Sequence, residues 1–497
     1  MSQYSEHYWK INIYKRNFEK ILDSINTTDD FNEKLNLAIY ASKYFVYHNT
    51  GYFTSSVLER FFLKCAKSIH LELHNIQYKK ASILHVLTNG YETGGHTRVV
   101  ERWIKNASPN QVHSVLQTKQ TGVSLSVLRN IVKEHNGNFI VFSNKLSITE
   151  KAIELRKLGM KYEYVVLHTH MEDPIPIIAF GTDDFTRPVL LYNHASHMPW
   201  LGKSGADVVL DIEKGDQVTS EKRKISNTFF LGVPSKSVSI EISDKNKERF
   251  KLNIPVDKKV IVTSGMAMKY RNISGKSFID YLIDIMDDNT YCYVIGVEKN
   301  NKEWKKSILK SGKKIFLLGV VDFNKGYLNY LKAADLYLDS YPVGGGTATI
   351  DAIASGTPAL SLQSVYPQFD YLIKTSAYCK TGKEFIQKAK QILCDKESAA
   401  KVFSELRESL VEHQSVAAWN KRMKELCHIV PERHKINNLN GVVDYSKPND
   451  LSVLTNTICN EKFIKIKRIR KISDKKLNMI KHKGRCKRLI RRLLKIL

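Results

Sequence analysis

The chain has 497 residues, 42% of them hydrophobic, so it is long enough to form two main domains with packed cores. Its formal net charge of +27 exceeds what solubility requires and predicts a polyanionic partner, either nucleic acid or an anionic membrane. The seven cysteines form no CxxC pair, no leader pattern opens the sequence, and no apolar run approaches the roughly 20 residues that span a bilayer. We therefore expect a cytoplasmic protein rather than an exported or membrane-spanning one.

The predicted elements fall into four zones. Residues 1–80 are predicted to be helical, because their apolar side chains recur at a period of 3.6 residues. Residues 81–235 and 236–430 each alternate short apolar runs with amphipathic stretches, which is typical of a parallel sheet with crossover helices. The runs are "SILHVLT", "FIVFS", "YVVLHTH", "PVLLYNH" and "DVVLDI", then "KKVIVTSG", "YCYVIGV", "KIFLLGVV", "ADLYLDSY" and "TPALSL". Residues 431–497 are predicted to be a polar linker and a basic tail.

This pattern predicts an α/β protein with two Rossmann-like domains that face a cleft, the usual ligand position in open α/β folds. The helical stretch "SVAAWNKRMKELC" near residue 420 is predicted to pack back across the first domain. A dinucleotide enzyme is disfavoured, because "YETGGHTRVVERWI" after the first strand lacks the GxGxxG fingerprint.

The stretch "DSYPVGGGTATIDA", residues 339–352, places three glycines and two threonines between a predicted strand and a predicted helix. Glycines let backbone N–H groups approach a ligand closely, and a helix N-terminus concentrates unpaired donors and positive dipole. The sequence therefore predicts a phosphate site at this turn, although a plain flexible turn would have the same composition.

The sequence resembles GT-B glycosyltransferases that use nucleotide-sugar donors, and in particular the O-GlcNAc-transferase-like and bacterial surface-glycan glycosyltransferases. The resemblance covers residues 81–430 and rests on four stretches: "TGGHTR" (93–98), "NHASHMPWLGKSGADVVLDI" (193–212), "SGMAMKYR" (264–271) and "DSYPVGGGTATIDA". It implies an N-terminal acceptor domain and a C-terminal donor domain.

The resemblance also implies roles for individual residues of the donor domain. The donor pyrophosphate is expected to contact the turn and two basic residues. The ribose is expected to contact an acid, and the nucleotide base is expected to contact the end of a strand. These residues are Gly345, Gly346, Thr347 and Thr349 in the turn, Lys269 and Arg271, the acid Asp351, and Gly319 with Val320 at the strand end.

No two aspartates are separated by a single residue, so the metal-binding DxD motif of GT-A enzymes is absent, and we expect no metal or other cofactor. Retaining GT-B enzymes carry a carboxylate eight residues before the ribose-binding acid, where this chain has Val343, so the resemblance favours inversion.

Inversion requires a general base from the N-terminal domain. The candidates lie near predicted strand ends or the first glycine turn: His170 and His96 are ranked first and His197 next, with Asp173, His168 and His194. Gly94 and Gly95 would let that turn approach the donor or the acceptor.

The basic tail accounts for more than half of the net charge. Residues 462–497 hold sixteen Lys or Arg and one acid, Asp474, a net charge of 16 − 1 = +15. Between Cys486 and Leu497 apolar residues recur at helical spacing opposite the basic ones, which predicts a helix on an anionic membrane surface. Phe463 is the only aromatic residue of the tail, which disfavours nucleic acid as the partner.

Together these features predict an inverting, metal-independent glycosyltransferase at the inner face of the cell membrane. It would move a hexose or N-acetylhexosamine from a UDP-sugar to a glycan or lipid-linked acceptor in bacterial capsule or lipopolysaccharide synthesis. Three alternatives stay open: a nucleotide-sugar 2-epimerase of the same fold, a protein glycosyltransferase, and a noncatalytic protein that binds membranes or nucleic acid.

Overall fold

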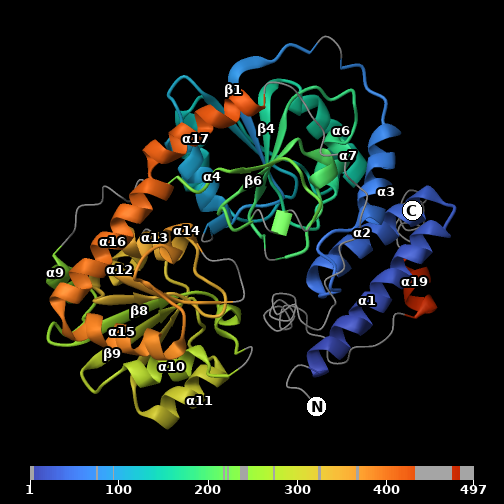
Figure 1. Ribbon diagram of the computed structural model, residues 1–497. Helices are drawn as coiled ribbons and strands as arrows, with labels where there is room; N and C mark the ends of the chain where they lie inside the picture. The colour runs from blue at the N-terminus through green and yellow to red at the C-terminus, as the bar shows by residue number, and fades with distance from the viewer. Residues whose placement is uncertain are drawn as a thin grey trace, which may run out of the picture.

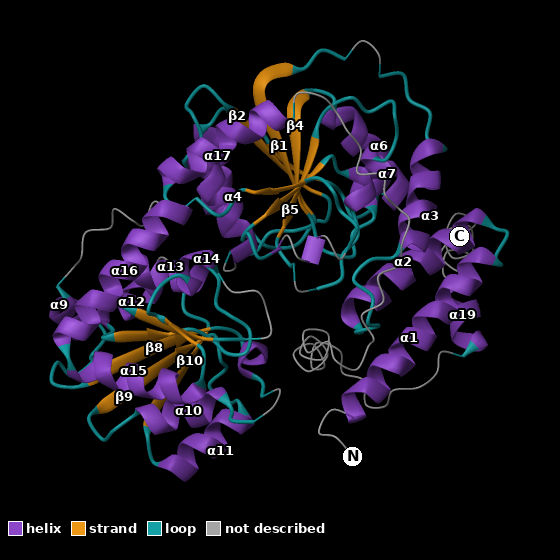
Figure 2. Ribbon diagram, in the orientation of Figure 1, coloured by secondary structure: helices purple, strands orange, loops and turns teal. Residues whose placement is uncertain are grey.

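The computed structural model describes residues 5–73, 76–92, 95–196, 198–216, 219–220, 223–234, 244–272, 275–322, 326–364, 369–430 and 473–481. Two parallel sheets, each flanked by helices, form two α/β domains, and a layer of helices lies beside the first of them (Figures 1 and 2). The predicted pair of Rossmann-like domains is confirmed.

The N-terminal helices share a hydrophobic core with the first α/β domain. They are α1 (Ser5–Asn26), α2 (Phe31–Tyr47) and α3 (Ser56–Lys67). Glu59 of α3 is fully buried and accepts hydrogen bonds from the backbone N–H groups of Gly202 and Ser204. The guanidinium of Arg156 is also buried and donates to four carbonyl groups, among them those of Ala66 and Ile69. These contacts fix the helical layer to the domain.

The first sheet has seven parallel strands in the order β3-β2-β1-β4-β5-β6-β7. Its strands are β1 (Lys79–Leu87), β2 (Val112–Gln117), β3 (Phe139–Val141), β4 (Tyr162–His168), β5 (Val189–Asn193), β6 (Val208–Asp211) and β7 (Thr228–Phe230). Its helices are α4 (Gly95–Lys105), α5 (Ser126–Glu134), α6 (Ile148–Gly159), α7 (Ile175–Phe180) and the short η1 (Lys203–Gly205). The order reverses after β1, which opens a crevice at the carboxyl ends of β1 and β4.

The second sheet has six parallel strands in the order β10-β9-β8-β11-β12-β13. They are β8 (Lys259–Ser264), β9 (Thr290–Ile295), β10 (Lys314–Gly319), β11 (Leu336–Leu338), β12 (Ala359–Leu362) and β13 (Tyr378–Cys379). The helices are α9 (Lys245–Lys251), η3 (Ala267–Tyr270), α10 (Phe278–Ile285), α11 (Lys302–Ser311), α12 (Leu328–Ala333), α13 (Thr347–Ala354), α14 (Asp370–Ile373), α15 (Gly382–Cys394) and α16 (Lys396–Gln414). The switch point of this sheet lies between β8 and β11, so the glycine turn after β11 opens toward the other domain.

The last helix of the second domain returns to the first, as predicted. After α16 the chain continues as α17 (Val416–Ile429), and Trp419 of this helix packs edge-to-face against Trp103 of α4, with ring centroids 5.2 Å apart. Arg422 of α17 donates from Nε to the carbonyl of Leu231, 2.8 Å away. The two domains are therefore joined by packing as well as by the connecting chain (Figure 1).

One helix near the C-terminus packs against the N-terminal helices. In α19 (Asp474–Lys481), Leu477 is buried, and the carbonyl of Lys481 accepts a hydrogen bond of 3.2 Å from Asn36 of α2 (Figure 1). The predicted amphipathic helix at residues 486–497 lies outside the described residues. Among the helices that the structure describes, none is long and apolar enough to cross a bilayer.

Candidate active site

A cavity of about 550 Å³ lies between the two domains. Its walls combine the start of α4 and the ends of β4 and β5 from the first domain with η3 and the glycine turn from the second. The N-terminal helical layer also contributes, through Val46 and Tyr47 at the end of α2. The site is thus assembled from three parts of the chain.

The glycine turn is built around Asp339, at the carboxyl end of β11. Its buried Oδ1 accepts hydrogen bonds from the backbone N–H of Gly345 at 2.6 Å and from the hydroxyl of Thr349 at 2.9 Å. A Cβ atom at Gly345 would lie 2.7 Å from this oxygen, so the turn needs glycine there. Burial raises the pKa of Asp339, and these bonds oppose the rise.

This arrangement differs from the predicted roles of two turn residues. The Gly345 N–H and the Thr349 hydroxyl, both expected to bind pyrophosphate, hold Asp339 instead, because a buried carboxylate must be hydrogen-bonded. Gly346 and Thr347 do line the cavity. Gly346 precedes α13 with φ of +60° and ψ of −116°, a conformation open to glycine, and the N–H groups of Ala348 and Thr349 donate to the carbonyls of Gly345 and Gly346 over 3.3 and 3.2 Å.

Lys269 lies at the cavity wall, where η3 meets the glycine turn. Its Nζ donates to the carbonyl of Gly344 over 2.8 Å, and both residues line the cavity. Burial lowers the pKa of Lys269, and the nearby charge of Asp339 opposes the change. The ammonium group is therefore held in place beside the N-terminus of α13.

The N-termini of α4 and α13 meet at this cavity. A Cβ atom on Gly95, the first residue of α4, would lie 3.5 Å from Oγ1 of Thr347, the first residue of α13. Thr93 and Gly94, which precede α4, lie outside the described residues. Because each helix N-terminus carries unpaired N–H groups and a partial positive charge, the two together favour an anionic ligand.

Asp351 was expected to bind a ribose and instead forms an ion pair between the domains. Its Oδ1 lies 2.5 Å from Nη2 of Arg102 on α4, and both side chains are largely buried. Burial raises the pKa of Asp351, and Arg102 opposes the rise. The carboxylate does not line the cavity, because it reaches across to α4.

Three other residues predicted to contact the donor lie apart from the cavity wall. Arg271 follows η3, and Gly319 ends β10, the edge strand of the sheet, with Val320 directly after it. Val320 is 75% exposed. The cavity lining among the described residues includes none of the three, so their predicted roles stay predictions.

His170 and His96 both line the cavity from the first domain. Nδ1 of His170 lies 3.9 Å from Oε1 of Glu172, which also accepts a hydrogen bond from the hydroxyl of Tyr47 at 2.9 Å. Nε2 of His96 donates to the carbonyl of His168 over 2.5 Å, which leaves Nδ1 of His96 without a proton. Burial lowers the pKa of His96 to about 4, so its imidazole is neutral at physiological pH.

Asp173 is not part of the cavity wall among the described residues, so its predicted catalytic role stays a prediction. Its buried carboxylate accepts hydrogen bonds from the hydroxyls of Thr88 and Thr118 and from the backbone N–H of Ile175. It thereby ties the loop after β4 to the end of β1, because a carboxylate at this depth must be satisfied internally. His197, the remaining candidate, lies outside the described residues.

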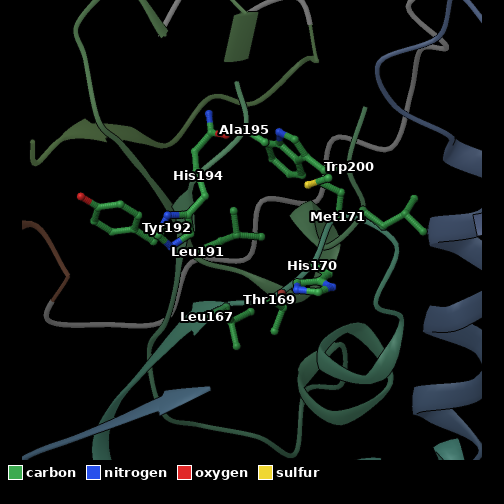
Figure 3. A pocket seen from close by; sticks show the side chains of 11 residues that line it. Leu167, Thr169, His170, Met171, Leu191, Tyr192, His194, Ala195 and Trp200 are labelled. Carbon is green, nitrogen blue, oxygen red and sulfur yellow. The ribbon is translucent and has the colours of Figure 1, made fainter. Parts of the chain in front are cut away.

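His168 and His194 are joined by a hydrogen bond between Nδ1 of the first and Nε2 of the second, 3.0 Å long. His194 lines the large cavity, and a second cavity of about 20 Å³ lies beside it between the ends of β4 and β5 (Figure 3). Figure 3 shows His170 and His194 on these two neighbouring strand ends. His168 itself is fully buried.

Two acids of the cavity wall, Glu213 and Asp216, were not among the residues predicted from the sequence. Both follow β6, and their position after an apolar strand could have identified them. Glu213 accepts a hydrogen bond from the backbone N–H of Asp370 in the other domain and another from Gln414 Nε2. Burial raises its pKa well above the usual value. Among the described residues, no group of three or more His, Cys, Asp or Glu side chains is arranged to hold a metal ion.

Comparison with known proteins agrees with this geometry. Residues 244–437 match the family described as glycosyl transferases group 1. The Anabaena protein HepE, solved with UDP and glucose, is 14% identical, with a TM-score of 0.55 over 70% of this chain and 100% of its own. The lipopolysaccharide outer core galactosyltransferase WaaB is 13% identical, with a TM-score of 0.51 over 70% of this chain and 99% of its own.

A glycosyltransferase from Rickettsia africae is also similar, at 13% identity and a TM-score of 0.52, over 71% of this chain and 100% of its own. No curated protein sequence matches the chain. At these identities the solved structures show the fold alone, and the family match, which covers the second α/β domain, supports a glycosyltransferase. Residues 244–437 therefore match the glycosyl transferases group 1 family, and the chain has the GT-B fold of the solved glycosyltransferases to which it is similar.

Proposed function

We propose that this enzyme transfers a sugar from a UDP-sugar to a glycan or lipid-linked acceptor in bacterial surface polysaccharide synthesis, with inversion and without a metal ion. The observation that carries the proposal is the convergence of two helix N-termini and Lys269 on one cavity. The likeness to HepE, which was solved with UDP and glucose, supports the choice of donor, and the likeness to WaaB supports the choice of pathway.

In this proposal, breaking the bond between sugar and phosphate leaves negative charge on the diphosphate. The N–H groups at the start of α13 and the ammonium of Lys269 stabilise that charge. The N-terminus of α4 adds positive potential from the opposite wall. These groups supply the charge that a divalent metal supplies in enzymes with a DxD motif.

The acceptor hydroxyl must lose a proton as it attacks the sugar. His170 is the proposed general base, because it lines the cavity beside the carboxylate of Glu172, which stabilises the imidazolium that forms. Glu172 is itself held by the hydroxyl of Tyr47 from the helical layer. The N-terminal helices thereby take part in the acceptor side of the site.

The test is to incubate the protein with several UDP-sugars and to identify retained or altered nucleotides by mass spectrometry. A glycosyltransferase binds one UDP-sugar preferentially and releases UDP only when an acceptor, or slowly water, is present. Conversion of the sugar to its 2-epimer without an acceptor would replace the proposal with an epimerase. Activity that is lost in EDTA and restored by Mn²⁺ or Mg²⁺ would overturn metal independence.

We also propose that the basic tail holds the enzyme on an anionic membrane surface. The packing of α19 against α2 places Lys481 on the N-terminal helical layer. The tail sequence that follows Lys481 would then hold this layer near the membrane, which suits an acceptor that is carried on a lipid.

A further inference from the structure

Four histidines form a continuous hydrogen-bonded row across the first sheet. His113 of β2 contacts His85 of β1 over 3.0 Å, His85 contacts His168 of β4 over 3.1 Å, and His168 contacts His194 over 3.0 Å. The first three side chains are fully buried, and the ring of Trp103 lies edge-on against His85 and His168. The row begins inside the domain and ends at the cavity, which His194 lines.

The row is neutral at physiological pH. Burial lowers the pKa of His85, His168 and His194 well below the usual value, and that of His113 to about 3. The titratable groups that face the row are the histidines His96 and His170 near the cavity, His135 beside His113, and Tyr192, whose ring packs against His168 and His194. No carboxylate among these described neighbours favours an imidazolium.

A neutral imidazole donates from one nitrogen and accepts at the other. The three contacts of the row can therefore be satisfied in only two ways, with all donors pointing toward the cavity or all pointing away from it. The two arrangements differ in which ring nitrogens carry a proton at the two ends of the row. Nε2 of His113 is buried without a partner among the described atoms, and it carries a proton only when the donors point toward the interior.

The free-energy cost of burying an N–H group without an acceptor at His113 favours one of the two proton arrangements. A buried N–H group without an acceptor is rarer in proteins than an acceptor with an unused lone pair. Nε2 of His113 is therefore bare, and the protons lie on Nδ1 of His113, His85, His168 and His194 in turn. Because Nε2 of His194 is occupied by His168, the Nδ1–H of His194, a residue of the cavity wall, is not used within the row.

We propose that the row holds His194 as an Nδ1–H donor that binds an anionic phosphate oxygen of the nucleotide. The inference rests on the proposed function for the identity of the ligand. His168, His85 and His113 are positioning residues: they fix the tautomer of His194, and their aligned ring dipoles reinforce its donor, since hydrogen bonds in a chain polarise one another. A neutral donor of this kind requires no buried cation. It also leaves the general base to His170.

The tautomers can be measured directly in the wild-type protein. The ¹⁵N chemical shifts of histidine rings distinguish a nitrogen that carries a proton from a bare one. We expect Nδ1–H at all four histidines in the free protein and after addition of UDP. Nε2–H at His194 would overturn the proposal, whether or not UDP binds.

A matched pair of substitutions at the far end tests the coupling to the ligand. The side chain of His113→Asn can still donate to His85, whereas that of an ionised His113→Asp only accepts and so reverses the row. We expect His113→Asp to move the proton of His194 to Nε2 and to weaken UDP binding about tenfold, the effect of one lost hydrogen bond. His113→Asn should keep the tautomer of His194 and should change the UDP affinity by no more than about threefold.

Uridine, which lacks phosphates, is the control ligand, and its affinity should be the same in both variants. Equal UDP affinity in the two variants despite a reversed row would overturn the phosphate contact. An equal loss of uridine and UDP affinity would point to general disruption and would also count against it. Failure of the wild type to bind UDP would overturn the proposed function, whereas the tautomer measurement on the free protein tests the row independently.

Discussion

At the scale of single residues, Lys269 places a positive charge beside the N-terminus of α13. We expect Lys269→Met to weaken UDP binding by about 10- to 100-fold, since a hydrogen bond to a charged group contributes about 1.5–3 kcal/mol. Isothermal titration calorimetry measures the change. Lys310→Met, on the surface of α11, is the matched control and should bind UDP as the wild type does. Unchanged affinity in Lys269→Met would remove this lysine from the phosphate site.

His170 is the second residue whose role can be isolated. We expect His170→Asn to lower kcat by about 10²- to 10⁴-fold, the usual contribution of a general base, with little change in UDP affinity. The measurement combines steady-state kinetics with calorimetry. His70→Asn, which is exposed between α3 and β1 and does not line the cavity, is the control. A variant that loses UDP affinity but keeps kcat would place His170 in donor binding instead.

At the scale of elements, the pair Arg102–Asp351 joins α4 to α13. Arg102→Met leaves a buried carboxylate without its partner, which raises the pKa of Asp351 further above its value in the unfolded chain. An acid with a raised folded pKa favours folding at low pH, and this contribution is lost as the pH rises through the folded pKa. The loss of stability in Arg102→Met should therefore be larger at pH 8 than at pH 5.

The measurement is the thermal midpoint of the variant and the wild type at the two pH values. Removal of one partner of a buried ion pair lowers the free energy of unfolding by up to about 3–5 kcal/mol. We expect a smaller loss here, because Arg102 is partly exposed. Adding Asp351→Asn to Arg102→Met should recover part of the loss at pH 8. A loss that is equal at both pH values would mean that Asp351 stays paired with another cation.

At the scale of the whole molecule, the tail and the catalytic domains are expected to act separately. Deletion of residues 482–497 keeps α19 on the helical layer, and it should release the protein from anionic vesicles while UDP affinity is retained. Replacing three leucines by Ser should weaken attachment to the vesicles even at low salt, because apolar burial contributes to membrane binding as well as charge. These leucines are Leu489, Leu493 and Leu494. Vesicle sedimentation measures both effects. Equal sedimentation of full-length and shortened protein would place the membrane contact elsewhere.

The class of fold and the turn at which an anion site is proposed could both be predicted from the sequence. Alternating apolar runs predicted two parallel sheets, since buried parallel strands need continuous hydrophobic segments. Three glycines at a strand-to-helix junction predicted the turn before α13, and "SVAAWNKRMKELC" predicted the return of α17, because these features depend on neighbours within a few residues. The resemblance implied Lys269, and the position of His96 and His170 near strand ends or the first glycine turn made them candidates; the structure places all three at the cavity.

Which polar groups line the cavity and which are held in internal contacts depends on the tertiary structure. Gly345, Thr349 and Asp173 are residue types expected at a ligand site, yet they contact other groups of the protein. Gly345 and Thr349 donate to the buried carboxylate of Asp339, and Asp173 accepts from a threonine hydroxyl, because a polar group removed from water needs a partner. The contacts of Asp351 with Arg102 and of Tyr47 with Glu172 join residues 249 and 125 positions apart. The histidine row likewise depends on strand order and register, which bring side chains from four segments into one line, and no local pattern in the sequence encodes that alignment.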